Sequence, residues 1–494
     1  MKAGSAATRS DRIVHRLIRS LRCAPLPAFI LLRCRKTRRE SEKRNLTIAD
    51  FVKQWYTGYT MITPRTLKGF RDFLPDIMLP RERLIETATE VFRSYGFCPI
   101  DTPALEYLEI LQGKGGDETD RQLYHFTDHG GRQVGLRFDL TVPLARYTAQ
   151  HFAELTFPFK RYHIGKVWRG ENTQAGRYRE FMQCDFDVIG TRSLAADIEI
   201  ALVINDLLVR LGFARFQVRI NNRKVLSGLL DKHGIADKTT PILRALDKLG
   251  KIGKSAVFKE MTETAALSTF QAEAVLALTD LTGTSAETLS ALRPLLAGNP
   301  LGEEGVSQLD ELIRSVRAVG IPENRIVLDV SIARGLDYYT GTIYETFLDD
   351  LPTIGSVCSG GRYDDLAGVY TKQELPGVGS SLGLDRLISA MEELGMLEKT
   401  ATPVQVFLPF FAVNRLADYL RFASDLRQSG VGVEFYPEAK KLGQQLKYAD
   451  KRGFRWAVII GEDEWAKGNC QIKDLQTSES IECLMSECIR RILR

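Results

Sequence analysis

The pattern of apolar and polar positions predicts one long helix followed by a sheet. From Leu79 to Tyr95, apolar residues recur at three- and four-residue spacing, and Gly96 follows where a helix C-cap would lie. Extended segments rich in β-branched or aromatic residues come next, mostly with polar alternation and with turn residues between them. They are Phe97–Pro103, Tyr162–Trp168, Phe181–Ile189, Phe216–Ile220, Ile326–Val330 and Thr342–Phe347. The pattern indicates a largely antiparallel sheet.

A helical segment interrupts this sheet. Between about Asn222 and Glu323 the apolar spacing becomes helical, after Pro241 and again near the end of the segment. The residues concerned are Ile242, Leu243, Leu246, Leu249, Leu309, Leu312, Ile313 and Val316. We therefore predict a helical insertion that splits the sheet domain.

From Pro403 onward strands and helices alternate. The expected order is strand Val404–Leu408, helix Leu416–Leu426, strand Val431–Tyr436, helix Leu442–Ala449, strand Trp456–Ile460 and a last helix near Ser480–Ile492. This order is typical of a small three-layer α/β domain. The expected class of the whole chain is α+β, with a basic extension at 1–60, a sheet core at 61–221 and 325–398, the insertion at 222–324 and the last domain at 403–494.

Composition and charge narrow the class of protein. The 494 residues suggest about three domains, and no apolar run approaches the ~20 residues needed to span a bilayer, so we expect a soluble protein. Eight scattered cysteines without a Cys-x-x-Cys pair indicate neither a disulfide framework nor a zinc site, and favour a reducing compartment. Residues 1–44 carry thirteen Lys or Arg against three acidic residues, so the remainder of this +5 chain is acidic. We interpret the tail as a disordered extension ahead of a natural start at Met61, with a nucleic-acid-binding arm or a targeting peptide as alternatives.

Four polar segments carry candidate chemistry. Two expected strands joined by a polar loop bring together Arg169, Glu171, Arg177 and Arg179. Guanidinium groups suit phosphate, although solvated surface ion pairs would explain the same residues. Gly377–Leu387 has the pattern of a glycine-rich turn before an apolar helix, which could approach a ligand or could simply be a packing turn. Arg334–Gly341 and Ser359–Leu366 have the composition of a polar pocket with aromatic walls, and equally that of a plain hairpin.

Taken in order, these segments resemble the class II aminoacyl-tRNA synthetases. Gly96-Phe97 with Ile100 and Pro103 resembles motif 1, Arg169-x-Glu171 with Arg177-x-x-x-Phe181 resembles motif 2, and Gly379–Leu387 resembles motif 3. Arg334-Gly-Leu-Asp-Tyr-Tyr339 and Gly360-Gly-Arg-Tyr-Asp364 resemble two signatures peculiar to the histidyl-tRNA synthetases. The resemblance runs from about Thr63 to the C-terminus. Departures are Asp385 in place of the usual Glu, Ser359 in place of a common Gly, and Asp139 and Asp187 where some members have Glu.

The resemblance implies roles for individual residues. Arg169 would hold the α-phosphate of ATP, and Arg334 would lie across it as a second catalytic charge. The adenine and outer phosphates would contact Glu171, Arg177 and Arg386. The segment Asp139-Leu140-Thr141, with Gln183, would bind the α-ammonium group of histidine. Asp187 and Tyr339 would meet the imidazole, and Tyr338 would line the pocket.

The implied activity is ATP- and Mg²⁺-dependent formation of histidyl-adenylate, followed by transfer to the 3′ end of tRNA(His). The resemblance also implies a cytoplasmic homodimer with the motif 1 helix and strand at its interface, and an anticodon-binding role for the last domain; it leaves the protein ligands of Mg²⁺ unassigned. A paralogue that serves as the regulatory subunit of ATP phosphoribosyltransferase is the alternative. That paralogue generally lacks both the Arg334–Tyr339 signature and the last domain, and this chain has both.

Overall fold

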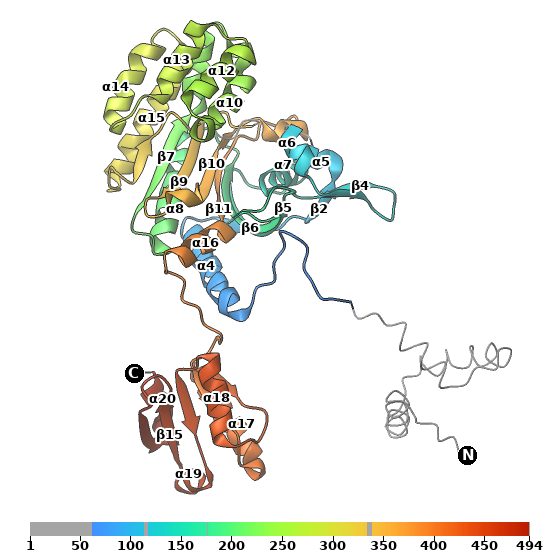
Figure 1. Cartoon of the computed structure of the whole chain (residues 1–494), viewed down its shortest axis with the longest axis vertical. Helices are drawn as coiled ribbons and strands as arrows, with labels where there is room; N and C mark the ends of the chain where they lie inside the picture. Colours follow the sequence, from blue (N-terminus) through green and yellow to red (C-terminus); the bar gives the residue numbers. More distant parts are fainter. Residues whose placement is uncertain (1–61, 113–116, 175, 333–337, 494) are drawn as a thin grey trace, which may run out of the picture. The chain divides into compact units, whose positions relative to one another are not determined.

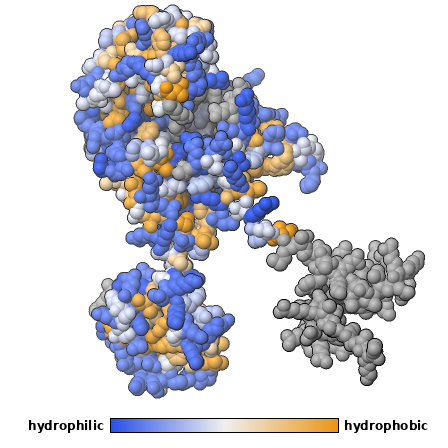
Figure 2. All heavy atoms as spheres, viewed as in Figure 1, coloured by the Kyte–Doolittle hydropathy of each residue, from blue (hydrophilic) through white to orange (hydrophobic). Residues whose placement is uncertain are grey.

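A computed structural model describes residues 62–493 except 113–116, 175 and 333–337. The chain divides into two compact units, Met1–Thr66 and Leu67–Arg494, and every element below belongs to the second. The interpretation of residues 1–60 as a disordered extension, and the role expected for Arg334, therefore lie outside the described residues. No helix in the described ranges is long and apolar enough to cross a bilayer, and Figure 2 shows polar and apolar side chains interspersed on the visible face.

An eight-stranded sheet forms the core, in the order β1-β5-β6-β11-β10-β9-β7-β8. The two outermost pairs, β1 with β5 and β7 with β8, are parallel and the pairs between them are antiparallel, as the alternating segments predicted. Its strands are β1 (Cys98–Pro99), β5 (Phe159–Trp168), β6 (Glu180–Ile189), β7 (Phe216–Asn222), β8 (Ile326–Leu328), β9 (Thr342–Leu348), β10 (Cys358–Tyr363) and β11 (Gly377–Gly383).

One of these strands, β11, was predicted incorrectly as a glycine-rich turn, and β10 lies in the segment interpreted as either a polar pocket or a plain hairpin. Gly360 and Gly361 lie inside β10, and Gly377, Gly379 and Gly383 lie inside β11. A Cβ atom on Gly379 would lie 1.9 Å from Oδ1 of Asp187, and one on Gly360 would lie 2.1 Å from the Gly379 carbonyl oxygen. These glycines therefore serve close packing within the sheet, and not the reversal of a turn.

Three long helices cover one face of the sheet. They are α4 (Pro75–Ser94), α8 (Leu194–Arg210) and α16 (Leu384–Glu393), and α4 and α16 both contact β6. The apolar stripe of α4 buries Leu84, Ala88, Val91 and Phe92. The helix starts with Pro75 at its first turn, four residues before the predicted start, and Gly96 follows its end with φ of +80°. The predicted helix is thus confirmed.

The chain between β7 and β8 is helical, as predicted (Figure 1). The helices are α9 (Arg223–Lys232), α10 (Thr239–Asp247), α11 (Leu249–Ile252), α12 (Lys254–Glu263), α13 (Thr269–Thr279), α14 (Ser285–Leu296) and α15 (Pro300–Ala318), with a 3₁₀ turn, η2 (Ala236–Lys238). Ser268 and Thr284 are the N-cap residues of α13 and α14, and each forms a capping box. Buried residues of these helices, such as Ile242 and Leu312, belong to the same hydrophobic cluster as the sheet core.

A three-stranded sheet, β2-β4-β3, was not predicted. It consists of β2 (Leu105–Tyr107), β4 (Gln133–Leu136) and β3 (His125–Thr127). Its neighbours in the chain are the helices α5 (Leu108–Gln112), α6 (Asp117–Gln122) and α7 (Thr141–Gln150). In the core sheet, the 3₁₀ turn η3 (Pro352–Ile354) connects β9 to β10, and η4 (Leu366–Val369) connects β10 to β11. Very short strands of this kind give too few alternations for a sequence pattern to detect.

A five-stranded sheet, β13-β12-β14-β15-β16, organises the C-terminal segment. Its elements are β12 (Val406–Leu408), η5 (Val413–Arg415), α17 (Leu416–Gln428), β13 (Val433–Phe435), α18 (Leu442–Arg452), β14 (Trp456–Ile459), α19 (Glu462–Lys467), β15 (Asn469–Asp474), β16 (Ser480–Leu484) and α20 (Met485–Ile492). Val406 and Leu408 belong to a core with residues of α17 and α20, whereas Phe407 packs with Ala449 of α18, so helices cover both faces. The helix–sheet–helix arrangement confirms the predicted three-layer α/β architecture of this segment. The predicted helix over Ser480–Ile492 is wrong in its first five residues, because they pair with β15 as a hairpin.

Candidate active site

A cavity opens on the face of the core sheet. Alternation along β6 produces it: Cys184, Phe186 and Val188 enter the hydrophobic cluster, while residues at the intervening positions line the cavity. The other cavity residues come from β10, β11, the segment before α7 and the tyrosine pair. The lining comprises Leu111, Phe138, Asp139, Thr141, Val142, Arg169, Gln183, Asp185, Asp187, Tyr338, Tyr339, Ser359, Gly360, Tyr363, Gly379, Ser380 and Ser381.

Seven of the residues implicated by the resemblance meet in this one cavity: Asp139, Thr141, Arg169, Gln183, Asp187, Tyr338 and Tyr339. Leu140 is not among the lining residues. It is fully buried and precedes the first residue of α7. Glu171, Arg177 and Arg386 also lie outside the lining, and Arg334 is outside the described residues.

The first turn of α7 orients Asp139. Its Oδ1 accepts hydrogen bonds from the backbone N–H groups of Thr141 at 3.1 Å and Val142 at 2.9 Å. An acidic side chain at this position also suits the positive end of a helix. The carboxylate is therefore fixed at the cavity wall, with its charge available to a cationic ligand group.

Asp187 already has partners on both oxygens. Its Oδ2 forms an ion pair with Nη2 of Arg161 at 2.7 Å, and its Oδ1 accepts a hydrogen bond from the Tyr363 hydroxyl. Burial raises the pKa of Asp187, and the nearby Arg161 charge opposes that shift. Arg161 is itself fully buried. Neither Arg161 nor Tyr363 was singled out from the sequence as a site residue.

Asp185 is a second carboxylate that the sequence reasoning missed. It is 2% exposed, and its Oδ1 has no hydrogen-bond partner. Burial raises its pKa to about 7, while Arg161 and a hydrogen bond with Ser381 act in the opposite direction. The signal that could have revealed it was the spacing of Gln183, Asp185 and Asp187, which places three polar residues on one face of a strand.

The tyrosine pair supplies neutral hydroxyl groups. The rings of Tyr338 and Tyr339 meet edge to face with their centres 4.8 Å apart, and Tyr338 also approaches Tyr363 at 6.2 Å. Burial raises the pKa of Tyr338 and of Tyr339 above the ordinary value of 10.0. Their hydroxyl groups therefore keep their protons near neutral pH and can donate hydrogen bonds.

Arg169 brings positive charge to the same cavity. Its guanidinium lies 4.3 Å from the centre of the Phe138 ring and 5.1 Å from that of Phe181, and its Nε donates to the Phe138 carbonyl at 3.1 Å. The two aromatic contacts hold the planar group in one orientation. A fixed guanidinium of this kind suits an anionic ligand.

A second polar group lies along the loop between β5 and β6. Arg177 Nη1 is 3.6 Å from Glu171 Oε2, and Arg179 donates from Nε to the Glu171 carbonyl at 3.3 Å. Arg386 lies against this loop, since a Cβ on Gly176 would be 3.4 Å from its Cα atom. The sequence expectation that these loop residues lie near one another is confirmed.

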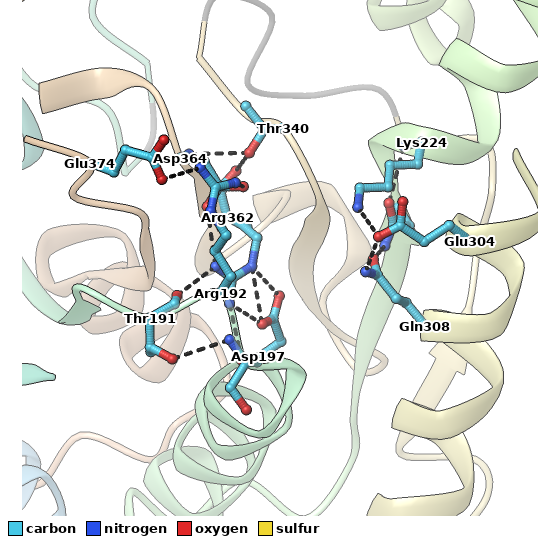
Figure 3. A network of polar contacts seen from close by, with 12 residues as sticks. Thr191, Arg192, Asp197, Lys224, Glu304, Gln308, Thr340, Arg362, Asp364 and Glu374 are labelled. Atoms are coloured by element: carbon cyan, nitrogen blue, oxygen red, sulfur yellow. Dashed lines mark hydrogen bonds and ion pairs between the residues drawn. The ribbon is translucent and has the colours of Figure 1, made fainter. Parts of the chain in front are cut away.

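Arg362, the arginine of the Gly-Gly-Arg-Tyr-Asp segment, does not line the cavity and belongs to a separate polar network (Figure 3). Its guanidinium binds both carboxylate oxygens of Asp197 on α8 and the backbone carbonyls of Thr191 and Ser193. It also pairs with Asp364 at 3.1 Å. This network anchors β10 to the start of α8, so the next residue, Tyr363, is held facing the cavity.

Metal ligation can be tested only on side chains that the structure describes. Among them, no group of three or more His, Cys, Asp and Glu residues is arranged to hold a metal ion. Carboxylates such as Asp139 and Asp185 supply the oxygen donors that Mg²⁺ prefers, and Mg²⁺ commonly combines few protein carboxylates with water and substrate phosphates. The cavity is therefore compatible with a metal ion that arrives with a nucleotide.

The comparisons with known proteins agree with this site. The family model described as histidyl-tRNA synthetase matches residues 69–387, and the model described as anticodon binding domain matches residues 411–494. The histidine–tRNA ligase of Rhodopirellula baltica is 60% identical over 420 residues, covering 85% of this chain and 95% of that protein. The corresponding ligase of Wolinella succinogenes is 46% identical over 435 residues, covering 88% and 98%.

Solved structures give the same result. The histidyl-tRNA synthetase of a Nostoc species matches with a TM-score of 0.80 at 38% identity, over 88% of this chain and 99% of that one. A Bacillus halodurans structure, titled as an ATP phosphoribosyltransferase regulatory subunit/histidyl-tRNA synthetase, matches at 23% identity with a TM-score of 0.65, which shows a shared fold only. On the family models, the relatives and the 38%-identical structure, this chain belongs to the histidyl-tRNA synthetase family.

Proposed function

We propose that this chain activates L-histidine with ATP and transfers the histidyl group to the 3′-terminal ribose of tRNA(His). The observation that carries the proposal is the single cavity that combines the Arg169 guanidinium with the Asp187 carboxylate and the tyrosine pair. Adenylation joins the carboxylate of the amino acid to the α-phosphorus of ATP and releases pyrophosphate. It needs orientation and positive charge, and no protein nucleophile.

The amino acid would bind along β6 and the start of α7. Asp139, Thr141 and Gln183 would hold its α-ammonium group, with Leu140 fixing the backbone between the first two. Asp187 and Tyr339 would recognise the imidazole, and Tyr338 would line the pocket beside it. A buried carboxylate and hydroxyl discriminate against apolar amino acids because those ligands leave them without partners.

The nucleotide would bind at the arginine side. Arg169 would contact the α-phosphate, and Glu171, Arg177 and Arg386 would hold the adenine and the outer phosphates. Arg334 would add a second charge at the reacting phosphate. Mg²⁺ bound with the phosphates would neutralise further negative charge as the bond to pyrophosphate breaks.

The family model described as anticodon binding domain supports a tRNA partner. The C-terminal segment would read single-stranded anticodon bases of tRNA(His) in the cytoplasm, because sequence-specific RNA readers usually target unpaired loops. A homodimer would use α4 and the β1 strand. Leu105 and Tyr107 of β2 and Phe126 of β3 are 40%, 50% and 49% exposed, which favours a partner surface on the three-stranded sheet. Light scattering on a size-exclusion column would test the dimer, and a monomer would contradict it.

The decisive experiment is ATP–pyrophosphate exchange with each of the twenty amino acids, followed by charging of tRNA. We expect exchange that depends on L-histidine and Mg²⁺, and charging of tRNA(His) alone. Absence of exchange in a folded protein would contradict the proposal and favour a regulatory role.

A further inference from the structure

Segment 67–73, which precedes α4 in the chain, lies against the loop between β5 and β6. The backbone N–H of Arg179 donates to the Gly69 carbonyl at 2.9 Å, and the N–H of Arg169 donates to the Arg179 carbonyl at 2.9 Å. Gly69 has a φ of +87°, and a Cβ atom there would lie 2.7 Å from Cγ of Arg179, so this close approach requires glycine. The segment therefore packs against the base of the loop.

Arg71 connects the loop to a buried carboxylate. Its guanidinium carbon lies 3.2 Å from the centre of the Tyr178 ring and 4.8 Å from that of the Phe73 ring. Its Nη2 forms an ion pair with Oδ1 of Asp385 at 2.5 Å. Asp385 is 2% exposed and also pairs with Arg81, so it is a fixed anchor for the Arg71 side chain. Anchored in this way, the Arg71 guanidinium covers one face of the Tyr178 ring.

Tyr178 lies in the part of the loop that carries its charged side chains. Its neighbours Arg177 and Arg179 both contact Glu171. Arg177 also pairs with Gln174 through an isolated backbone bridge. A loop held by few contacts loses conformational entropy when it orders around a ligand, so a contact that orders the loop beforehand raises its affinity for that ligand.

We propose that Arg71 is a positioning residue of the nucleotide site, which holds Tyr178, and with it the neighbouring Arg177, in place for ATP. The inference rests on the proposed function, because it assumes that the loop between β5 and β6 binds ATP. Arg71 is not among the residues that line the cavity. Its effect on the nucleotide therefore passes through the Tyr178 ring.

Pyrophosphate exchange by the full chain, with ATP and histidine varied separately, tests this. We expect Arg71→Ala to raise KM for ATP roughly fivefold to tenfold and to leave KM for histidine within twofold of wild type. Arg71→Lys keeps a positive charge beside Asp385 but lacks the planar group that stacks on Tyr178, so KM for ATP should rise by a similar factor. Arg215→Ala, which breaks the exposed pair with Asp350, is the matched control and should change neither KM.

Variants of Tyr178 test the same contact without touching the Asp385 ion pair. Tyr178→Phe keeps the ring, so KM for ATP should stay within twofold of wild type, whereas Tyr178→Leu should raise it as Arg71→Ala does. The double variant Arg71→Ala/Tyr178→Leu should be no worse than either single variant, because both changes remove one contact.

Three results would overturn the inference. They are an unchanged KM for ATP in a folded Arg71→Ala protein, an equal rise of both KM values, which indicates a structural role, and additive effects of the two changes in the double variant. Absence of histidine-dependent exchange in the wild type would instead contradict the proposed function.

Discussion

Arg81 and Asp385 form a buried bidentate ion pair, although 304 positions separate them in the chain. Arg81 Nη1 donates to Oδ1 of Asp385 at 2.8 Å and Nη2 to Oδ2 at 3.1 Å, and the side chains are 3% and 2% exposed. The backbone N–H of Met182 donates to the same carboxylate at 2.7 Å. One carboxylate thus joins α4, β6 and α16.

The first prediction concerns this junction. Asp385→Ala leaves Arg81 buried without a counter-charge, so we expect a loss of about 3–5 kcal/mol in the free energy of unfolding. Urea unfolding followed by tryptophan fluorescence measures it. Asp350→Ala, which breaks the exposed pair with Arg215, should change stability by less than about 1 kcal/mol. Equal effects of the two changes would contradict a structural role for Asp385.

The second prediction concerns the Tyr363 hydroxyl. Tyr363→Phe removes the donor to Asp187 and leaves a buried carboxylate oxygen unpaired, at a cost of about 1.5–3 kcal/mol. We expect KM for histidine in pyrophosphate exchange to rise roughly tenfold or more, with KM for ATP unchanged. Tyr370→Phe is the control, because Tyr370 donates to the Ile110 carbonyl and does not line the cavity. A similar change in both variants would argue against a role for Tyr363 in the histidine pocket.

The third prediction concerns the free energy of unfolding, to which His163 and Asp185 should contribute opposite pH dependences. His163 lies opposite Asp185 in the sheet. Burial, with Arg161 and Arg137, lowers its pKa from 6.5 to about 4, so the stability it contributes is present above pH 6.5 and lost as the pH falls towards 4. Burial raises the pKa of Asp185 from 3.8 to about 7, so its contribution is present below pH 3.8 and lost as the pH rises through 7.

Single substitutions should separate the two trends. Relative to wild type, His163→Gln should lose stability as the pH rises from 4 to 7, and Asp185→Asn should gain it, each by on the order of 3 kcal/mol across the window. Urea unfolding at half-unit pH intervals measures both slopes. Parallel curves for the three proteins would show that neither group titrates as described.

The spacing of apolar residues predicted the helices and strands whose residues follow a regular period. The α4 stripe and the β5 and β6 strands follow the periods of helix and strand, so their residues are recognisable before any contact is known. The glycines of β11 were misread as a turn because glycine favours turns, whereas Gly379 is needed for the close approach of Asp187, which is distant in the chain. The Arg81–Asp385 pair was unpredictable for the same reason.

The site was predictable only in part. Family resemblance supplied Asp139, Gln183 and Asp187, and the structure brings them together in one cavity. Arg161 does not stand out in the sequence, and Asp185 does so only through its spacing with Gln183 and Asp187. A buried charged residue in a strand looks like an exposed one until its neighbours are known. Their importance comes from burial, which changes the energy of each charge.

The fourth prediction concerns Arg334, whose role is expected from the resemblance alone. Arg334→Ala should lower kcat for pyrophosphate exchange by ~10²–10³ or more, because a charge aimed at the reacting phosphate contributes mainly in the transition state. The melting temperature should stay near that of wild type, and Arg334→Lys should recover part of the rate. Exchange at the wild-type rate in Arg334→Ala would show that this residue is not catalytic.

The last prediction separates activation of histidine from charging of tRNA. None of the cavity residues comes from the chain after Pro403, so deletion of Pro403–Arg494 should reduce tRNA charging much more than histidine-dependent exchange. The physical reason is that the C-terminal segment, with its own hydrophobic clusters on both faces of its sheet, would contact unpaired anticodon bases and lower the KM for tRNA. Loss of exchange together with a lowered melting temperature would show instead that the deletion destabilises the core. Paired assays at the same protein concentration distinguish these results, and a soluble truncated chain that charged tRNA(His) with unchanged efficiency would rule out the anticodon role.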